Sequence, residues 1–120
     1  MSELVSHAAT VLSVSDMKQS LEFYTKVLGF ELTFGWNEPV DYAVLKRGDV
    51  SIHLTSGVES GQISKNPVLY IFVYDVDLLF DEIVAKGGEV KNDPGDREYG
   101  MRDFDIEDPD GYMITFGKGI

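Results

Sequence analysis

The chain has 120 residues, a formal net charge of −11 and no cysteine. This length can bury a core, and 43% hydrophobic residues exclude a disordered chain. The lack of cysteine excludes disulfides and thiolate metal sites, and the acidic balance argues against nucleic-acid binding. Because no segment resembles a signal peptide or a membrane span, we expect a cytoplasmic protein without membrane contact.

The first half of the chain predicts one helix flanked by strands. Asp16 has the side chain of a helix N-cap, and apolar residues recur at helical spacing until Gly29 ends the pattern. The tripeptide Arg47-Gly48-Asp49 predicts a hairpin turn. The expected strands of this half cover residues 10–14, 30–36, 41–46 and 50–55. Strict alternation in the second of these strands predicts one face formed by Phe30, Leu32, Phe34 and Trp36.

The second half repeats this order of elements. Asp75 takes the place of Asp16, and the helical pattern that follows it stops at Gly87-Gly88. Residues 108–111, Asp-Pro-Asp-Gly, predict a turn between two strands. The expected strands of this half cover residues 68–74, 89–91, 101–107 and 112–116, and residues 92–99 are expected to form a loop.

Each half therefore predicts a βαβββ unit, which gives an α+β fold. A unit of about 60 residues is marginal as an independent domain, so we expect both units to share one sheet and one core. This predicts a single domain over residues 1–120, with module 1 at 1–56, a linker at 57–66 and module 2 at 67–120. The cleft between the modules is the natural place for a functional site.

Alternation along the strands separates a core face from a mixed polar and aromatic face. Ile52 and Leu54 are expected under the helices, whereas His53 points the opposite way. The other residues expected on the face of His53 are Ala9, Val11, Ser13, Ser51, Thr55, Val68, Tyr70, Phe72, Tyr74, Met113 and Thr115. A face of this mixed character suits a ligand-binding concavity.

The order and spacing of three motifs resemble the vicinal oxygen chelate superfamily of glyoxalase I, extradiol dioxygenases, and fosfomycin- and bleomycin-resistance proteins. The motifs are residues 14–30, the run Tyr-Gly-Met-Arg-Asp-Phe at 99–104 and the turn at 108–111. The resemblance implies two βαβββ modules that form a curved eight-stranded mixed sheet around a cavity, with the helices on the outer face. It also implies a homodimer.

Metal enzymes of this superfamily bind a divalent ion through His and Glu side chains from four strands. The resemblance places these positions at Ala9, His53, Val68 and Thr115. Ala and Val have no donor atom, Thr is a poor ligand, and catalytic sites commonly use about three protein ligands. His7, one pleat from Ala9, does not complete the set. We therefore expect no metal and no other cofactor, with His53 as a hydrogen-bonding or proton-transfer group.

Without the ion, the chain resembles the bleomycin-resistance branch, which sequesters a cationic, aromatic glycopeptide and has no catalytic step. Phe34 and Tyr99 match positions where those proteins stack the rings of the drug, and Asp103 and Asp105 would attract a cation. We expect a small aromatic or cationic molecule to bind in a groove at a dimer interface. The residues expected to contact it are Phe34, Trp36, Tyr42, His53, Tyr70, Phe72, Tyr99, Asp103, Met113 and Thr115.

Two other functions remain open from the sequence. An enzyme of the same fold, a lyase, isomerase or dioxygenase-like protein, would use His53 as a general base, although no acid is expected beside it. A structural or interaction module would fill the mixed face with apolar bulk, whereas Thr55 and Thr115 keep it polar. Some candidates also have structural interpretations: Phe34 can fill the core, and Arg102 can pair with Asp103 at the surface.

Overall fold

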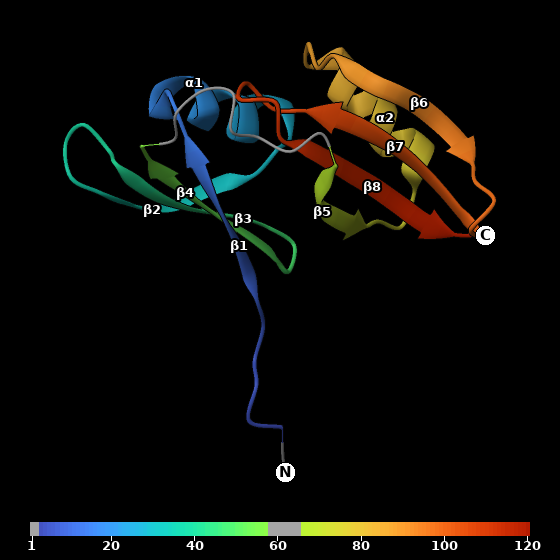
Figure 1. The fold of residues 1–120 in the computed structure, drawn as a ribbon, viewed down its shortest axis with the longest axis horizontal. Coiled ribbons are helices and arrows are strands. Elements are labelled where there is room, and N and C mark those ends of the chain that lie inside the picture. The colour runs from blue at the N-terminus through green and yellow to red at the C-terminus, as the bar shows by residue number, and fades with distance from the viewer. Residues whose placement is uncertain (1–2, 58–65) are drawn as a thin grey trace.

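A computed structural model describes residues 3–57 and 66–120, so residues 58–65 of the predicted linker lie outside the described residues. In chain order the elements are β1 (Ala9–Val14), α1 (Met17–Glu22), the π-helix η1 (Phe23–Val27), β2 (Glu31–Trp36), β3 (Tyr42–Arg47), β4 (Val50–Ser56), β5 (Pro67–Phe72), α2 (Val76–Ala85), β6 (Val90–Asp96), β7 (Met101–Glu107) and β8 (Met113–Gly119). Figure 1 shows the N-terminal half, blue to green, beside the C-terminal half, yellow to red. The predicted α+β class with two βαβββ modules is confirmed.

Both helices begin at the predicted aspartates. The Asp16 carboxylate accepts a hydrogen bond from the backbone N–H of Gln19 at 3.1 Å, and Asp75 accepts one from Leu78 at 3.0 Å. Each cap satisfies a backbone donor that has no partner within the helix. The first helix continues from α1 into η1, and Gly29 ends it with a φ of +75°. The change to π-helical geometry was not predicted by the apolar spacing.

The eight strands form two four-stranded mixed sheets of equivalent topology, in the orders β1-β4-β3-β2 and β5-β8-β7-β6, instead of one shared eight-stranded sheet. In each sheet the first strand of the module pairs in parallel with the last, and the remaining pairs are antiparallel. Ile52, Leu54 and Ile114 are fully buried, as alternation predicted. The opposite faces of the two sheets, which carry His53 and Thr115 respectively, are called the module 1 face and the module 2 face below.

The single face predicted for strand 30–36 is wrong, because β2 contains a bulge. Leu32 pairs with Leu45 on the core side, but Phe34 pairs with Val44, and the register shifts between the two pairs. Thr33 is therefore an extra residue, and its hydroxyl donates to the Val44 carbonyl at 3.1 Å. A bulge reverses the side-chain alternation beyond it. Phe34 and Trp36 consequently lie on the module 1 face, while Phe30 is in the core.

The predicted loop at residues 92–99 is also wrong in its first half. β6 extends from Val90 to Asp96 and pairs with β7, with register shifts between Val90 and Asn92 and between Asn92 and Gly95. Pro94 lies in the second of these irregularities. Proline is tolerated there because the strand is at the edge of its sheet and the ladder is interrupted. The remaining residues turn the chain into β7.

Polar contacts join the two modules. The buried Tyr24 hydroxyl donates to the Asp108 carboxylate at 2.7 Å, and the Tyr112 hydroxyl donates to the Ser13 carbonyl at 2.8 Å. The predicted turn at 108–111 is confirmed, and it therefore also positions Asp108 for this contact. In the described ranges, no helix has the length and apolar character needed to cross a membrane.

Candidate functional site

The module 1 face carries a chain of four contacting rings. Phe34 and Trp36 lie 4.2 Å apart between ring centroids, Trp36 and Tyr42 5.4 Å, and Tyr42 and His53 5.5 Å, each in an edge-to-face arrangement. The Tyr42 hydroxyl and His53 Nδ1 also form a hydrogen bond of 2.7 Å. Edge-to-face contacts are favourable between aromatic rings. The rings therefore form an ordered surface, which we call the ring cluster.

Strand register explains why these rings meet. Phe34 pairs with Val44, which pairs with His53, which pairs with Val11, so one row crosses all four strands of the sheet. The neighbouring row brings Trp36 beside Tyr42. Phe34 is 52% exposed and Trp36 is 46% exposed. Their ring faces are therefore available to a ligand or a partner surface, and the core-filling interpretation of Phe34 is wrong.

The module 2 face is organised around the carboxylate of Asp103, which is only 1% exposed. One oxygen, Oδ2, accepts hydrogen bonds from the hydroxyls of Tyr70 at 2.9 Å and Tyr99 at 2.7 Å. The other, Oδ1, accepts from Arg97 Nε at 2.8 Å, and Arg97 Nη2 donates to the Asp103 carbonyl at 2.9 Å. Buried carboxylates need partners of this kind. We call these four residues the Asp103 cluster.

The protonation states of the cluster follow from these contacts. Burial by itself would raise the pKa of Asp103, but hydrogen bonds from Arg97, Tyr99 and Tyr70 outweigh it and hold the pKa below its ordinary value. Desolvation, and then the hydrogen bond to Asp103, raise the pKa of the Tyr70 hydroxyl well above its ordinary value. The Asp103 cluster therefore holds a carboxylate and two protonated tyrosines at neutral pH.

Gly117 provides the space that this arrangement needs. A Cβ at this position would lie within 2.9 Å of Asp103 Cβ and would overlap the Tyr70 hydroxyl. Gly117 pairs with Asp103 on β7 and with Phe72 on β5, so a side chain there would stand on the module 2 face. The glycine thus lets Tyr70 lie across β8 and reach Asp103.

Asp105 is the second carboxylate of the module 2 face, and its environment differs from that of Asp103. It accepts hydrogen bonds from the Thr115 hydroxyl and from Asn92 Nδ2, the latter at 2.7 Å. Both partners are neutral, and no ion pair to Asp105 is found among residues 3–57 and 66–120. Arg97 donates to Asp103 and interacts with Asp105 only at longer range, so Asp105 is the carboxylate of this pair whose hydrogen-bond donors among the described residues are all neutral.

The side chains at the four metal positions of the superfamily do not fit a divalent ion. Ala9 and Val68 offer no donor, the Thr115 hydroxyl donates to Asp105, and His53 Nδ1 is hydrogen-bonded to Tyr42. In the part of the chain that the structure describes, no three His, Asp or Glu side chains are grouped so that they could hold a metal. A single imidazole nitrogen is too few ligands for a catalytic ion.

The structure gathers the predicted binding residues into two groups rather than one. Phe34, Trp36, Tyr42 and His53 form the ring cluster, whereas Tyr70, Tyr99 and Asp103 meet in the second cluster with Phe72 beside Tyr70. Thr115 pairs with Asp105, in the row of the sheet next to the row of Asp103 and Gly117. Met113 lies nearer the start of β8, where it pairs with Glu107. Within the described ranges, no hydrogen bond or ring contact joins the two groups.

Arg97 was not predicted as a site residue, and Arg102 was predicted with the wrong partner. Arg97 lies in the segment predicted as a loop. The sequence signal that could have identified it is its position as a basic residue within an acidic stretch of the chain. Arg102 pairs with Asp77 at 2.8 Å and Asp96 at 3.1 Å, not with Asp103. Adjacent residues of a strand point to opposite faces, so Arg102 and Asp103 cannot meet.

Comparison with known proteins places these features in context. The model of the family "Glyoxalase/Bleomycin resistance protein/Dioxygenase superfamily" matches residues 5–116. A probable lactoylglutathione lyase of Vibrio cholerae is 37% identical over 88% of this chain and 84% of its own length. A bleomycin resistance protein of Geobacillus stearothermophilus is 31% identical over 91% of this chain and 93% of its own.

A solved structure gives the same picture of the fold. The bleomycin-binding protein of Streptomyces verticillus, crystallised with copper(II)-bleomycin, aligns with a TM-score of 0.74 and 26% identity. The alignment covers all of both chains.

Proposed function

The chain belongs to the glyoxalase/bleomycin resistance protein/dioxygenase superfamily, and within it we propose a metal-free binding protein for a small aromatic or cationic molecule. The observation that carries this proposal is the exposed ring cluster, which presents Phe34 and Trp36 beside His53. Among the residues that the structure describes, no group of side chains accompanies His53 to hold a metal. Stacking on such rings contributes about 0.5–1.5 kcal/mol per contact beyond the buried area. The site therefore favours a planar ring.

The Asp103 cluster supplies the second half of the proposed site. The hydroxyl of Tyr99 is held by Asp103 while the residue as a whole is 67% exposed, so Tyr99 offers a positioned aromatic surface. Asp105 adds an anionic group without a cationic partner among the described residues. Together they suit a ligand with a ring and a positive charge. The bleomycin-binding relative supports this class of ligand.

We propose that the groove is completed by a second copy of the chain. The ring cluster and the Asp103 cluster lie on separate sheets, and both faces expose large apolar side chains, including Val11 and Phe72. Exposed apolar surface of this kind marks interaction sites. Sedimentation velocity should give a dimer for the wild type and a monomer for Val11→Asp. A wild-type chain that is monomeric at all concentrations contradicts this part of the proposal.

Trp36 makes the proposal testable because it is the only tryptophan. Titration of metal-free bleomycin should change Trp36 fluorescence with a saturable curve. Phe34→Ala and Tyr99→Ala should weaken binding about threefold to tenfold. Val84→Ala removes exposed apolar surface from α2, outside both clusters and outside the cavity described below, and should leave the affinity unchanged. A fluorescence change that does not saturate, or that neither variant alters, contradicts the proposal.

A second candidate, an enzyme with a non-canonical site, draws on one observation. The 2.7 Å hydrogen bond between Tyr42 and His53 is the geometry of a proton-transfer pair. The residues paired with His53 are Val11 and Val44, so neither strand neighbour supplies a carboxylate. We therefore rank binding above catalysis. Turnover of a substrate that His53→Ala abolishes, with the fold intact, would reverse this order.

A further inference from the structure

A cavity of about 590 Å³ lies between the two modules, away from the ring cluster. Module 1 contributes Phe30 and the turn between β3 and β4, whereas module 2 contributes the end of β5 and the first turns of α2. Small-molecule sites in proteins typically have volumes of about 300–1,000 Å³. Of the residues proposed above for ligand binding, only Phe72 lines this cavity.

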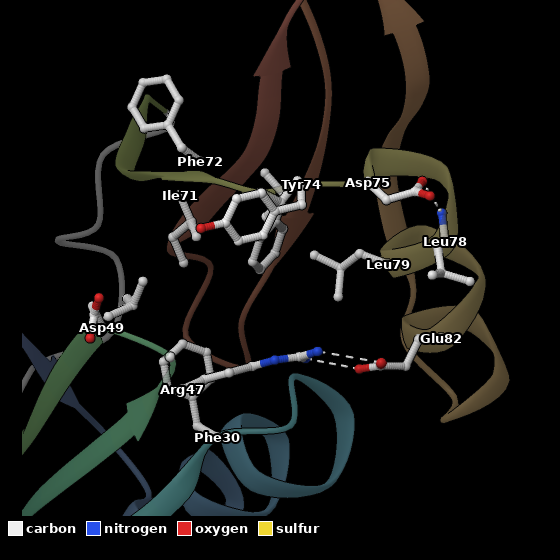
Figure 2. A pocket seen from close by; sticks show the side chains of 14 residues that line it. Phe30, Arg47, Asp49, Ile71, Phe72, Tyr74, Asp75, Leu78, Leu79 and Glu82 are labelled. Atoms are coloured by element: carbon white, nitrogen blue, oxygen red, sulfur yellow. Dashed lines mark hydrogen bonds and ion pairs between the residues drawn. The ribbon is translucent and has the colours of Figure 1, made fainter.

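The walls of the cavity are mainly apolar. Ile71, Leu79 and Phe116 contribute side chains from β5, α2 and β8, and Phe30 faces them from module 1. Tyr74, at the rim, is 97% exposed. Figure 2 shows Leu79 projecting from α2 into the space between the modules. An apolar wall with an exposed aromatic rim suits the hydrocarbon body of a ligand.

Arg47 is the one cationic side chain that the described residues contribute to the lining, and it is already paired. Arg47 donates to Glu82 Oε2 at 2.8 Å and to the Leu28 carbonyl at 2.8 Å, and Figure 2 shows it reaching from module 1 toward α2. Its charge is therefore compensated by Glu82, and it cannot attract an anionic ligand strongly. The Arg47–Glu82 pair closes one side of the cavity.

The uncompensated charge of the lining is negative. Asp49 lies in the exposed turn and has no hydrogen-bond or ion-pair partner among residues 3–57 and 66–120. Asp75 also lines the cavity, but it caps α2, whose N-terminal dipole offsets part of its charge. The lining therefore combines apolar walls with one free carboxylate and one partly compensated carboxylate.

From these features we propose that the inter-module cavity is a second binding site, for a small organic monocation with an apolar body. The apolar part would contact Leu79, Ile71 and Tyr74, and the positive group would lie toward Asp49. This site is separate from the groove proposed above, because it faces α2 and the turn at residues 47–49 rather than the ring cluster.

The test uses 2-naphthylmethylammonium, with the neutral 2-naphthylmethanol and the anionic 2-naphthoate as matched probes. In ¹H–¹⁵N spectra of the full chain, the ammonium probe should shift the amides of Gly48 and Leu79 saturably, and 2-naphthoate should not. Asp49→Asn should weaken ammonium binding about threefold. Asp81→Asn removes an exposed charge from α2 outside the lining and should have no effect.

Two further variants keep the proposal falsifiable if one of them fails to fold. Tyr74→Ala changes an exposed side chain and should weaken the ammonium probe, and Leu79→Trp should fill the cavity and abolish binding. Shifts confined to the amides of His53 and Tyr99 would overturn the cavity site while leaving the groove intact. Equal binding of all three probes would overturn the charge preference.

Discussion

The hydroxyl of Tyr42 lies 2.7 Å from Nδ1 of His53, so the one histidine at a metal position of the superfamily has a ring nitrogen engaged by a neighbouring side chain. Hydrogen bonds from neighbouring residues to histidine also occur in metal sites, where they fix the ring for coordination. Here Val11 and Val44 flank His53 on the adjacent strands and offer no donor. The hydrogen bond from Tyr42 therefore holds His53 within the ring cluster.

Gly117→Ala should destabilise the fold by about 1–3 kcal/mol, because the added methyl overlaps the Tyr70 hydroxyl and crowds Asp103. The free energy of unfolding in urea measures this loss. Gly119→Ala is the matched control on the same strand, since a Cβ added there would meet no other atom within 4 Å. The cost of Gly117→Ala should be smaller in a Tyr70→Phe background, which lacks the overlapping hydroxyl. Equal effects at both glycines would contradict the packing argument.

Stability should fall on acidification because the pKa of Asp103 is lowered in the folded state. Such a group stabilises the fold fully above its unfolded pKa of about 3.9, and this contribution is lost as the pH falls through the folded pKa. Urea unfolding at pH 7 and at pH 3 tests the direction. Asp103→Asn should lower stability at pH 7 and reduce the pH dependence, whereas the exposed substitution Asp81→Asn should change neither. An unaltered pH dependence in Asp103→Asn would contradict the assignment.

Tyr24→Phe should cost about 1–3 kcal/mol at pH 7, because it removes the donor to Oδ2 of the buried Asp108 carboxylate, while Oδ1 keeps the backbone N–H groups of Asp110 and Tyr112. Burial raises the pKa of Asp108, while the Tyr24 hydrogen bond opposes that rise. Tyr24 therefore stabilises the ionised form, and the difference between wild type and variant should shrink as Asp108 becomes protonated at lower pH. A difference that grows toward low pH would refute this account. Tyr112→Phe, which loses a bond to a backbone carbonyl, is the comparison.

The Arg47–Glu82 pair should contribute little to stability despite its 2.8 Å geometry. Both side chains are more than a third exposed, so solvent screens the interaction. A double-mutant cycle with Arg47→Ala and Glu82→Ala should give a coupling free energy below about 1 kcal/mol, decreasing with added salt. A coupling of several kcal/mol that salt does not change would show that the pair behaves as a buried one.

Local signals in the sequence predicted most of the fold. Asp16 and Asp75 cap their helices, and the turns at 47–49 and 108–111 form where predicted, because caps and turns depend on a few adjacent residues. The predicted side-chain faces and strand bounds were wrong where the backbone geometry depends on the partner strand. The bulge at Thr33 and the irregular pairing around Pro94 both depend on the opposing strand, which alternation within one strand does not report.

The candidate site was predicted by residue type but not by arrangement. Alternation identified the faces of His53 and Thr115, since it needs only the strand itself. The ion pair between Arg97 and Asp103 depends on how the turn at residues 97–100 leads the chain into β7. The space that the Tyr70 side chain occupies depends on Gly117, which lies on the neighbouring strand. These are tertiary contacts, which a single sequence does not specify.

Metal-free binding is tested most directly by a calorimetric titration of chelator-treated protein with metal-free bleomycin, and separately with Zn²⁺ and Ni²⁺. We expect saturable bleomycin binding in the presence of EDTA. We also expect the metal ions to bind wild type no more tightly than His53→Ala. A stoichiometric metal site that His53→Ala abolishes, and without which bleomycin does not bind, would contradict the central claim.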